Sequence, residues 1–116
     1  MASGAVEAAR TLVERYYSAI AAHDVAAMLD CVSEDVSVTF PDSGRDWQGR
    51  ASAEVKFAGW FQSQPDVLVR DLTITACFEC AEGREVAVEL SCDFGSGLRS
   101  MGYRVRDGAI AVISHL

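Results

Sequence analysis

The 116-residue sequence contains no asparagine, a single lysine (Lys56) and only two prolines, and its acidic residues outnumber its basic ones. Seventeen Asp and Glu against ten Lys and Arg give a formal net charge of −7 at pH 7. Proteins that bind nucleic acids neutralise phosphates with clustered Lys and Arg, so this small and scattered basic content argues against a nucleic-acid partner. The same deficit argues against binding to an anionic membrane surface.

Long apolar runs are missing as well. No segment approaches the roughly 18–20 consecutive apolar residues that a membrane span requires. Residues 1–7 lack the basic start and the apolar stretch of a secretory signal. We therefore expect a cytoplasmic protein with no membrane partner, and the length predicts a single domain over residues 1–116.

The cysteines offer neither a disulfide framework nor a clear metal site. Cys77 and Cys80 form a lone Cys-x-x-Cys pair within an alternating stretch that is typical of a strand. A redox pair would instead begin a helix, and a structural zinc site needs four ligands, usually from a second such pair. Only Cys31, Cys92 and two histidines remain to complete such a site. We expect four free thiols, no metal and no cofactor.

The first half of the sequence has mainly helical periodicity. Apolar residues recur at three- and four-residue spacing over residues 5–22, which predicts a first helix. Asp24 can cap a short second helix that runs through residue 32. Alternation over residues 36–40 predicts a strand, and a third helix follows over residues 49–63.

The second half alternates apolar and polar residues in segments that begin near residues 72, 86, 98 and 109. In the first of these segments the alternation predicts that Phe78 faces the core and Cys77 faces away. Asp107 and Gly108 form the strongest short hairpin signal in the chain. Three consecutive hairpin links predict an antiparallel sheet, and helices gathered on one face of such a sheet make an α+β fold.

This order of elements resembles the nuclear transport factor 2-like superfamily, and within it the SnoaL-like and ketosteroid-isomerase-like proteins. The resemblance also rests on Arg-Tyr-Tyr at residues 15–17, Ala-His-Asp at 22–24, and Ser-Glu-Asp-Val at 33–36. Trp-Gln-Gly-Arg at 47–50 further resembles the wound-induced type of SnoaL-like protein. The resemblance spans residues 6–115. It implies a cone-shaped, strongly curved antiparallel sheet wrapped around three helices of the N-terminal half (a cystatin-like fold), one open apolar pocket, and a homodimer.

Ketosteroid isomerase has three catalytic groups, and the resemblance implies a match for one of them in this chain. Tyr16 matches the tyrosine of the oxyanion hole on the first helix. Phe40 stands where the general-base aspartate would be, and Met101 stands where the second oxyanion-hole carboxyl would be. Because an isomerase needs a base to move the proton, steroid isomerisation is not expected.

Counting with a period of two from Met101 identifies which residues of the last two strands share its face. The expected inward set is Met101, Tyr103, Val105, Ala109, Ala111, Ile113 and His115, and the expected outward set includes Ile110, Val112 and Ser114. His115 is then the group of near-neutral pKa that faces the pocket. Together with Tyr16 it could act as acid and base.

Three residues are candidate catalytic groups: Tyr16, His115 and Asp42. Tyr16 could equally be a core tyrosine with a hydrogen-bonded hydroxyl, and Asp42 could simply form its turn. The candidate ligand-binding residues are apolar and share the inward face, although they could also be plain core: Val38, Phe40, Phe57, Trp60, Val88, Leu90, Met101 and Ile113.

Two functions from different classes remain open. The first is a protein that binds a small apolar or polyketide-like molecule in an apolar pocket and could support cofactor-free acid–base chemistry of the isomerase, cyclase or dehydratase type. The alternative is a non-catalytic homodimerisation or scaffold module. A mixed outer sheet face with an apolar end at Ile110 and Val112 would suit a sheet-to-sheet homodimer.

Overall fold

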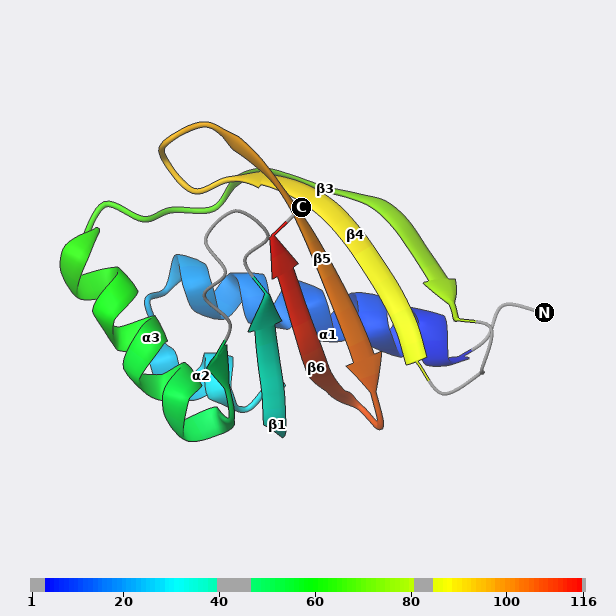
Figure 1. Cartoon of the computed structure of the whole chain (residues 1–116). Coiled ribbons are helices and arrows are strands. Elements are labelled where there is room, and N and C mark those ends of the chain that lie inside the picture. The colour runs from blue at the N-terminus through cyan, green and yellow to red at the C-terminus, as the bar shows by residue number, and fades with distance from the viewer. Residues whose placement is uncertain (1–3, 40–46, 81–84, 116) are drawn as a thin grey trace.

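The computed structural model of the chain describes residues 4–39, 47–80 and 85–115, which form helices packed against a curved sheet (Figure 1). In chain order the elements are α1 (Gly4–Ala21), α2 (Val25–Leu29), β1 (Val32–Thr39), β2 (Trp47–Gln48), α3 (Arg50–Ser63), β3 (Arg70–Glu79), β4 (Glu85–Asp93), β5 (Leu98–Arg106) and β6 (Ala109–His115). The predicted α+β class is confirmed. The short strand β2 is an addition that the sequence pattern did not indicate.

The turn between α1 and α2 is held by His23. This residue has a left-handed backbone with φ 54°, which reverses the chain after α1. Its ring stacks on Phe61 with centroids 4.3 Å apart, and its Nε2 lies 2.7 Å from the carbonyl oxygen of Val67. His23 therefore ties the end of α1 to the segment that follows α3.

Asp24 caps α2, as the sequence predicts. Its side chain accepts a hydrogen bond from the backbone N–H of Ala27 at 3.1 Å. The helix ends at Leu29, three residues before the predicted end, because Val32 is already the first residue of β1 and pairs with β6.

The sheet has the strand order β2-β1-β6-β5-β4-β3. The meander from β3 to β6 is antiparallel throughout, as predicted from its hairpin links. β1 instead pairs with β6 in parallel, so the sheet is mixed. β2 adds an antiparallel partner at the outer edge of β1.

Two irregularities in strand pairing shift the alternation by one residue. Between β3 and β4 the register changes after Ile74, so Cys77 lies opposite the buried Val88, while Phe78 is 48% exposed. The prediction that Phe78 faces the core was therefore wrong. A β-bulge adds one unpaired residue and turns every later side chain to the other face.

The second irregularity lies between β5 and β6. Arg104 pairs with Val112, whereas the next residue, Val105, pairs with Ile110, so Ala111 is the extra residue. Ile110 is completely buried in the core. The prediction that Ile110 faces outward, at the apolar end of a dimer face, was wrong for this reason.

α1 lies along the concave side of the sheet and contacts β3, β4 and β6, whereas α3 packs against β1 and β2 (Figure 1). The buried stripe of α1 supplies much of the core: Ala9, Leu12, Val13, Tyr16, Tyr17, Ala19 and Ile20. These positions recur every three to four residues, which is why one helix face can stay buried along its whole length.

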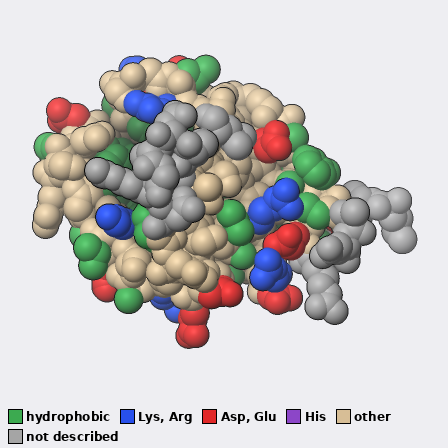
Figure 2. Space-filling view, viewed as in Figure 1, with side chains coloured by type: hydrophobic (Ala, Val, Ile, Leu, Met, Phe, Trp, Pro, Cys, Tyr) green, Lys and Arg blue, Asp and Glu red, His purple; other side chains and the backbone are tan. Residues whose placement is uncertain are grey.

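Figure 2 shows hydrophobic side chains in small scattered groups on one face of the molecule, with acidic and basic side chains close together. On β5, two arginines pair with a single carboxylate of β4. Arg106 Nη2 and Arg104 Nη1 lie 2.5 Å and 3.7 Å from the carboxylate oxygens of Glu85. Among the described residues, no helix is both long and apolar enough to cross a membrane.

Candidate functional site

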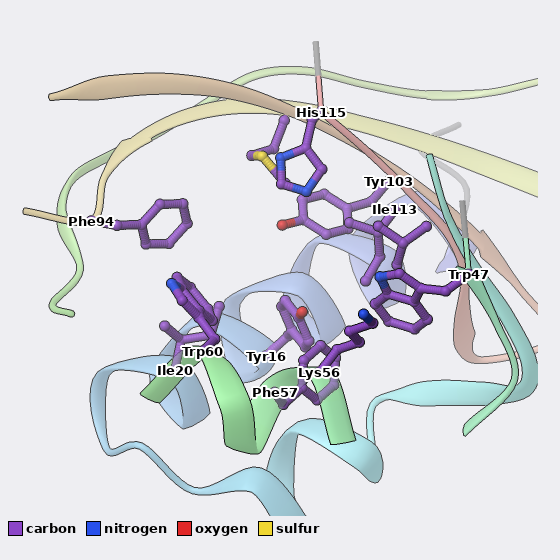
Figure 3. A pocket seen from close by; sticks show the side chains of 12 residues that line it. Tyr16, Ile20, Trp47, Lys56, Phe57, Trp60, Phe94, Tyr103, Ile113 and His115 are labelled. Carbon is purple, nitrogen blue, oxygen red and sulfur yellow. The ribbon is translucent and has the colours of Figure 1, made fainter. Parts of the chain in front are cut away.

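A cavity of about 310 Å³ lies between the concave face of the sheet and the helices α1 and α3 (Figure 3). Its wall is mostly apolar and aromatic, with a few polar groups. The lining residues are Tyr16, Ile20, Val38, Trp47, Lys56, Phe57, Trp60, Phe94, Met101, Tyr103, Ile113 and His115. This size and lining are typical of small-molecule sites.

Helix and strand periodicity explains how these side chains meet. Tyr16 and Ile20 are one helical turn apart on α1, and Lys56 and Trp60 have the same spacing on α3. On the sheet, alternate residues of β5 and β6 face the cavity. Met101 pairs with His115 and Tyr103 pairs with Ile113.

The helix side of the cavity is built from edge-to-face aromatic contacts. The ring of Tyr16 lies 6.1 Å from that of Phe57 and 5.9 Å from that of Tyr103. Trp60 and Phe94 meet at 5.3 Å on another side of the cavity. Such contacts position the rings and give the cavity a rigid wall.

Two tyrosine hydroxyls form a buried pair behind this wall. The hydroxyl oxygens of Tyr17 and Tyr103 are 2.5 Å apart, and either can be the donor. Burial raises the pKa of both phenols well above the usual value of 10. Both hydroxyls are therefore protonated at neutral pH. One of the two protons forms the hydrogen bond between them, and the other can be donated to a further acceptor.

The hydroxyl of Tyr16 is arranged differently. It lines the cavity, and within the described residues it has no protein hydrogen-bond partner. Burial is the main cause of its raised pKa, with the neighbouring Tyr103 adding to it. A neutral phenol that faces a cavity can donate a hydrogen bond to a ligand oxygen.

His115 lies on β6 and its ring is directed into the cavity (Figure 3). Burial lowers the pKa of this imidazole below its usual value of 6.5, and the positive charge of Arg99 lowers it further. The ring is therefore mainly neutral at pH 7. A neutral imidazole can accept a proton.

A model of the SnoaL-like domain family matches residues 13–113 of the sequence. The chain belongs to the SnoaL-like domain family. The predicted resemblance is thereby confirmed.

Solved structures support the same assignment. A provisionally named polyketide cyclase from Xanthomonas campestris pv. campestris shares 27% identity, with a TM-score of 0.66 over 96% of this chain and 90% of that one. A cystatin-like protein of unknown function from Methylobium petroleophilum PM1 shares 19% identity, with a TM-score of 0.68 over 95% and 75% of the two chains. A provisionally named ketosteroid isomerase from Kribbella flavida shares 20%, with a TM-score of 0.61 over 93% and 76%. No curated protein matches the chain.

Most of the residues predicted for the site of this SnoaL-like domain surround one cavity. They are Tyr16, Val38, Phe57, Trp60, Met101, Ile113 and His115. Val88 and Leu90, also predicted as ligand-binding, are buried in the core on β4 and do not line the cavity. Phe40 and Asp42 lie outside the described residues.

The sequence analysis of this SnoaL-like domain missed several lining residues, of which Lys56 is the most informative. Lys56 is the only lysine in the chain and directly precedes Phe57, which was predicted to face the ligand. Tyr103 was assigned to the inward face but not to the site. Its spacing of two residues from Met101 was the available signal.

Within the described part of this SnoaL-like domain, no group of three His, Cys, Asp or Glu side chains could hold a metal ion. The four cysteines are free, with Cys31 and Cys92 buried. The chemistry available in the cavity is that of an imidazole, phenols and one ammonium group.

Proposed function

We propose that this SnoaL-like protein binds a small, largely apolar molecule in the cavity and carries out cofactor-free acid–base chemistry on it, of the isomerase, cyclase or dehydratase type. The observation that carries the proposal is the cavity of about 310 Å³, whose apolar wall holds the neutral imidazole of His115 and the phenol of Tyr16, which has no hydrogen-bond partner among the described residues. In such a site the apolar wall provides most of the affinity for the ligand, and a few polar groups fix the orientation of the ligand.

In this proposal His115 is the base and Tyr16 is the hydrogen-bond donor. The imidazole takes a proton from a carbon next to a ligand carbonyl. The electron pair of that C–H bond forms a carbon–carbon double bond, and the π pair of the carbonyl moves to its oxygen. The Tyr16 hydroxyl stabilises the resulting enolate oxygen by donating a hydrogen bond. The imidazolium then returns the proton to another carbon, or to an oxygen that leaves as water.

The named neighbours support this class of chemistry without fixing the substrate. The relative from Xanthomonas campestris is provisionally named a polyketide cyclase, and the one from Kribbella flavida a ketosteroid isomerase. Steroid isomerisation is disfavoured because Met101, a thioether, lines the cavity where the resemblance would require a carboxyl group.

Ligand binding can be tested with the neutral fluorophore N-phenyl-1-naphthylamine. Both tryptophans of the chain, Trp47 and Trp60, line the cavity, so energy transfer from them to the probe reports occupancy directly. Val38→Phe fills part of the cavity, whereas Val55→Phe adds the same ring at a position that is 70% exposed on α3. We expect Val38→Phe to weaken probe binding at least tenfold and Val55→Phe to leave it unchanged. Equal binding by all three proteins would contradict the proposed site.

The acid–base step can be tested with 2-tetralone, a two-ring ketone with exchangeable protons next to its carbonyl. Proton NMR in D₂O follows its protein-dependent deuterium exchange. We expect His115→Gln to lower that rate by about a hundredfold, a modest value for a positioned base. His23→Gln removes the chain's other imidazole, outside the cavity, and should leave the rate unchanged. Exchange no faster than in buffer with the wild-type protein would count against the chemistry.

The alternative is a non-catalytic homodimerisation module that would use the outer face of the sheet as its interface. Phe78 on β3 and Leu98 on β5 are 48% and 66% exposed there. If light scattering shows a dimer that binds no fluorophore and promotes no exchange, this alternative is favoured over ligand binding.

A further inference from the structure

Lys56 is the one Lys or Arg among the described residues that line the cavity. Its side chain rises from α3 among the lining residues, with its terminal nitrogen on the Trp47 side of the cavity (Figure 3). The ion pairs of the described residues join arginines to Asp93 and Glu85, and none of them involves Lys56. No carboxylate of the described chain lines the cavity.

A second positive charge acts on the same space from the sheet side. Arg99 lies close enough to His115 to lower the pKa of its imidazole, in addition to the effect of burial. Among the described residues, the charges at the cavity are therefore positive, in a chain whose formal net charge is −7. A cation beside an apolar wall, with no carboxylate partner among the described residues, can pair with an anion.

We infer that the ligand of this cavity is a small amphipathic acid, whose anionic oxygen group, in the simplest case a carboxylate, pairs with Lys56 while its apolar body packs among the aromatic rings. This inference rests on the proposed function and adds the substrate class to it. It also orients the ligand. The acid group faces α3, and the reacting carbon faces His115 on the sheet.

The size of the cavity limits the apolar body. Small-molecule sites span roughly 300–1,000 Å³, and this cavity of about 310 Å³ lies at the lower end of that range. A body of one or two fused rings fits this volume.

A matched pair of probes isolates the charge. 2-Naphthoate and 2-naphthamide have the same two-ring body and nearly the same shape, but only the first carries a negative charge at pH 7. Isothermal titration calorimetry at low salt gives the affinity of each probe for the wild-type protein and for three variants. Lys56→Met removes the charge and keeps the chain length, whereas Lys56→Arg keeps the charge. Arg10→Gln removes a cation from the exposed side of α1, outside the cavity lining, as a control for net charge.

We expect the wild type to bind 2-naphthoate about five- to tenfold more tightly than 2-naphthamide, since the charge pair is partly exposed to water. Lys56→Met should abolish this preference and leave the affinity for 2-naphthamide unchanged. Lys56→Arg should restore most of the preference, and Arg10→Gln should retain all of it. Added salt should weaken only the binding of 2-naphthoate to proteins that keep a cation at position 56.

Three results would overturn the inference. Equal affinity for both probes in the wild type, or a preference that survives Lys56→Met, would show that Lys56 does not select an anion, while the cavity would remain a ligand site. If neither probe binds, the proposed function fails together with the inference. Circular dichroism of each variant distinguishes these results from a loss of fold.

Discussion

The hydroxyl oxygens of Tyr17 and Tyr103 lie 2.5 Å apart in the core and join α1 to β5 across 86 positions of the sequence. The ring of Tyr103 forms part of the cavity wall, and the ring of Tyr17 stacks on Phe94, which lines the same cavity. The pair therefore connects the helix layer to the sheet at the point where the cavity needs a rigid wall.

Removal of one hydroxyl from this pair should destabilise the protein more than removal of both. Tyr17→Phe leaves the hydroxyl of Tyr103 buried with its partner gone, at a cost of about 1–3 kcal/mol in the free energy of unfolding. The double variant leaves no unpaired group, so its cost should be smaller than the sum of the two single costs. Urea unfolding of the four proteins measures this coupling.

Tyr16→Phe is the matched control for this double-mutant cycle, because within the described residues the Tyr16 hydroxyl has no protein partner. It should change the free energy of unfolding by less than about 0.5 kcal/mol. Additive costs for Tyr17 and Tyr103 would show that their hydroxyls do not share a bond in solution.

The protonation of His115 should make stability depend on pH near neutrality. Folding lowers the pKa of this imidazole below 6.5 through burial and then through Arg99, so between the folded and unfolded pKa values the unfolded chain binds more protons. The free energy of unfolding should therefore fall as pH decreases from about 7 through 6.5 and level off below the folded pKa. Urea unfolding at a series of pH values measures the slope.

In the His115→Gln variant, the free energy of unfolding should no longer have the pH dependence that this imidazole causes. Arg99→Gln should raise the His115 pKa only partly toward 6.5, because burial is the larger cause. Proton NMR of the imidazole C–H signals reads the pKa directly. A His115 pKa at or above 6.5 in the wild type would contradict both the burial argument and the role of His115 as a neutral base.

Much of the fold could be predicted because its signals are local. The stripe of α1, the cap at Asp24 and the hairpin at Asp107 and Gly108 each depend on residues close together in the sequence. The parallel pairing of β1 with β6 could not be predicted in this way. It joins two distant segments, and no local pattern of residues in either strand indicates the pairing partner.

The bulges explain which side chains were assigned to the wrong face. Alternation identifies a face only until an extra residue enters the strand, and no turn residue marks Thr75 or Ala111 as such positions. His115 nevertheless shares the cavity with Met101, because the strand pairing beyond the bulge places the two residues directly opposite each other. Lys56 was missed because a lone lysine on a helix is usually solvated, and its sequence neighbours do not reveal a cavity.

The bulge at Ala111 predicts that truncations on either side of it destabilise the protein to different extents. Ile110→Ala should cost about 2–5 kcal/mol in the free energy of unfolding, because Ile110 is fully buried in the core. Val112→Ala should cost less than about 1 kcal/mol, because Val112 is only partly buried and points to the other face. Chemical denaturation of the two variants measures the difference. If the two costs were similar, Ile110 and Val112 would share one face of the sheet, as simple alternation without a bulge requires.

Asp93 should stabilise the turn between β4 and β5 only while it is ionised. Its carboxylate accepts hydrogen bonds from Arg70 at 2.7 Å and from the backbone N–H groups of Gly95 and Gly97 at 2.7 Å and 3.2 Å. These donors, with Arg70 first, lower its pKa to about 2. The contribution of Asp93 to the free energy of unfolding is therefore complete above the usual pKa of about 4, and it is lost as pH falls from about 4 to 2.

Asp93→Asn should consequently lower the midpoint of urea unfolding at pH 7, and the difference from the wild type should shrink as pH approaches 2. Glu54→Gln, which neutralises an exposed carboxylate on α3, is the matched control and should leave the midpoint unchanged. The effect should also reach the cavity. Phe94 follows Asp93 directly and contacts Trp60, so a loosened turn should weaken N-phenyl-1-naphthylamine binding. If the stability fell without any change in probe binding, the turn would support the fold alone and not the shape of the cavity.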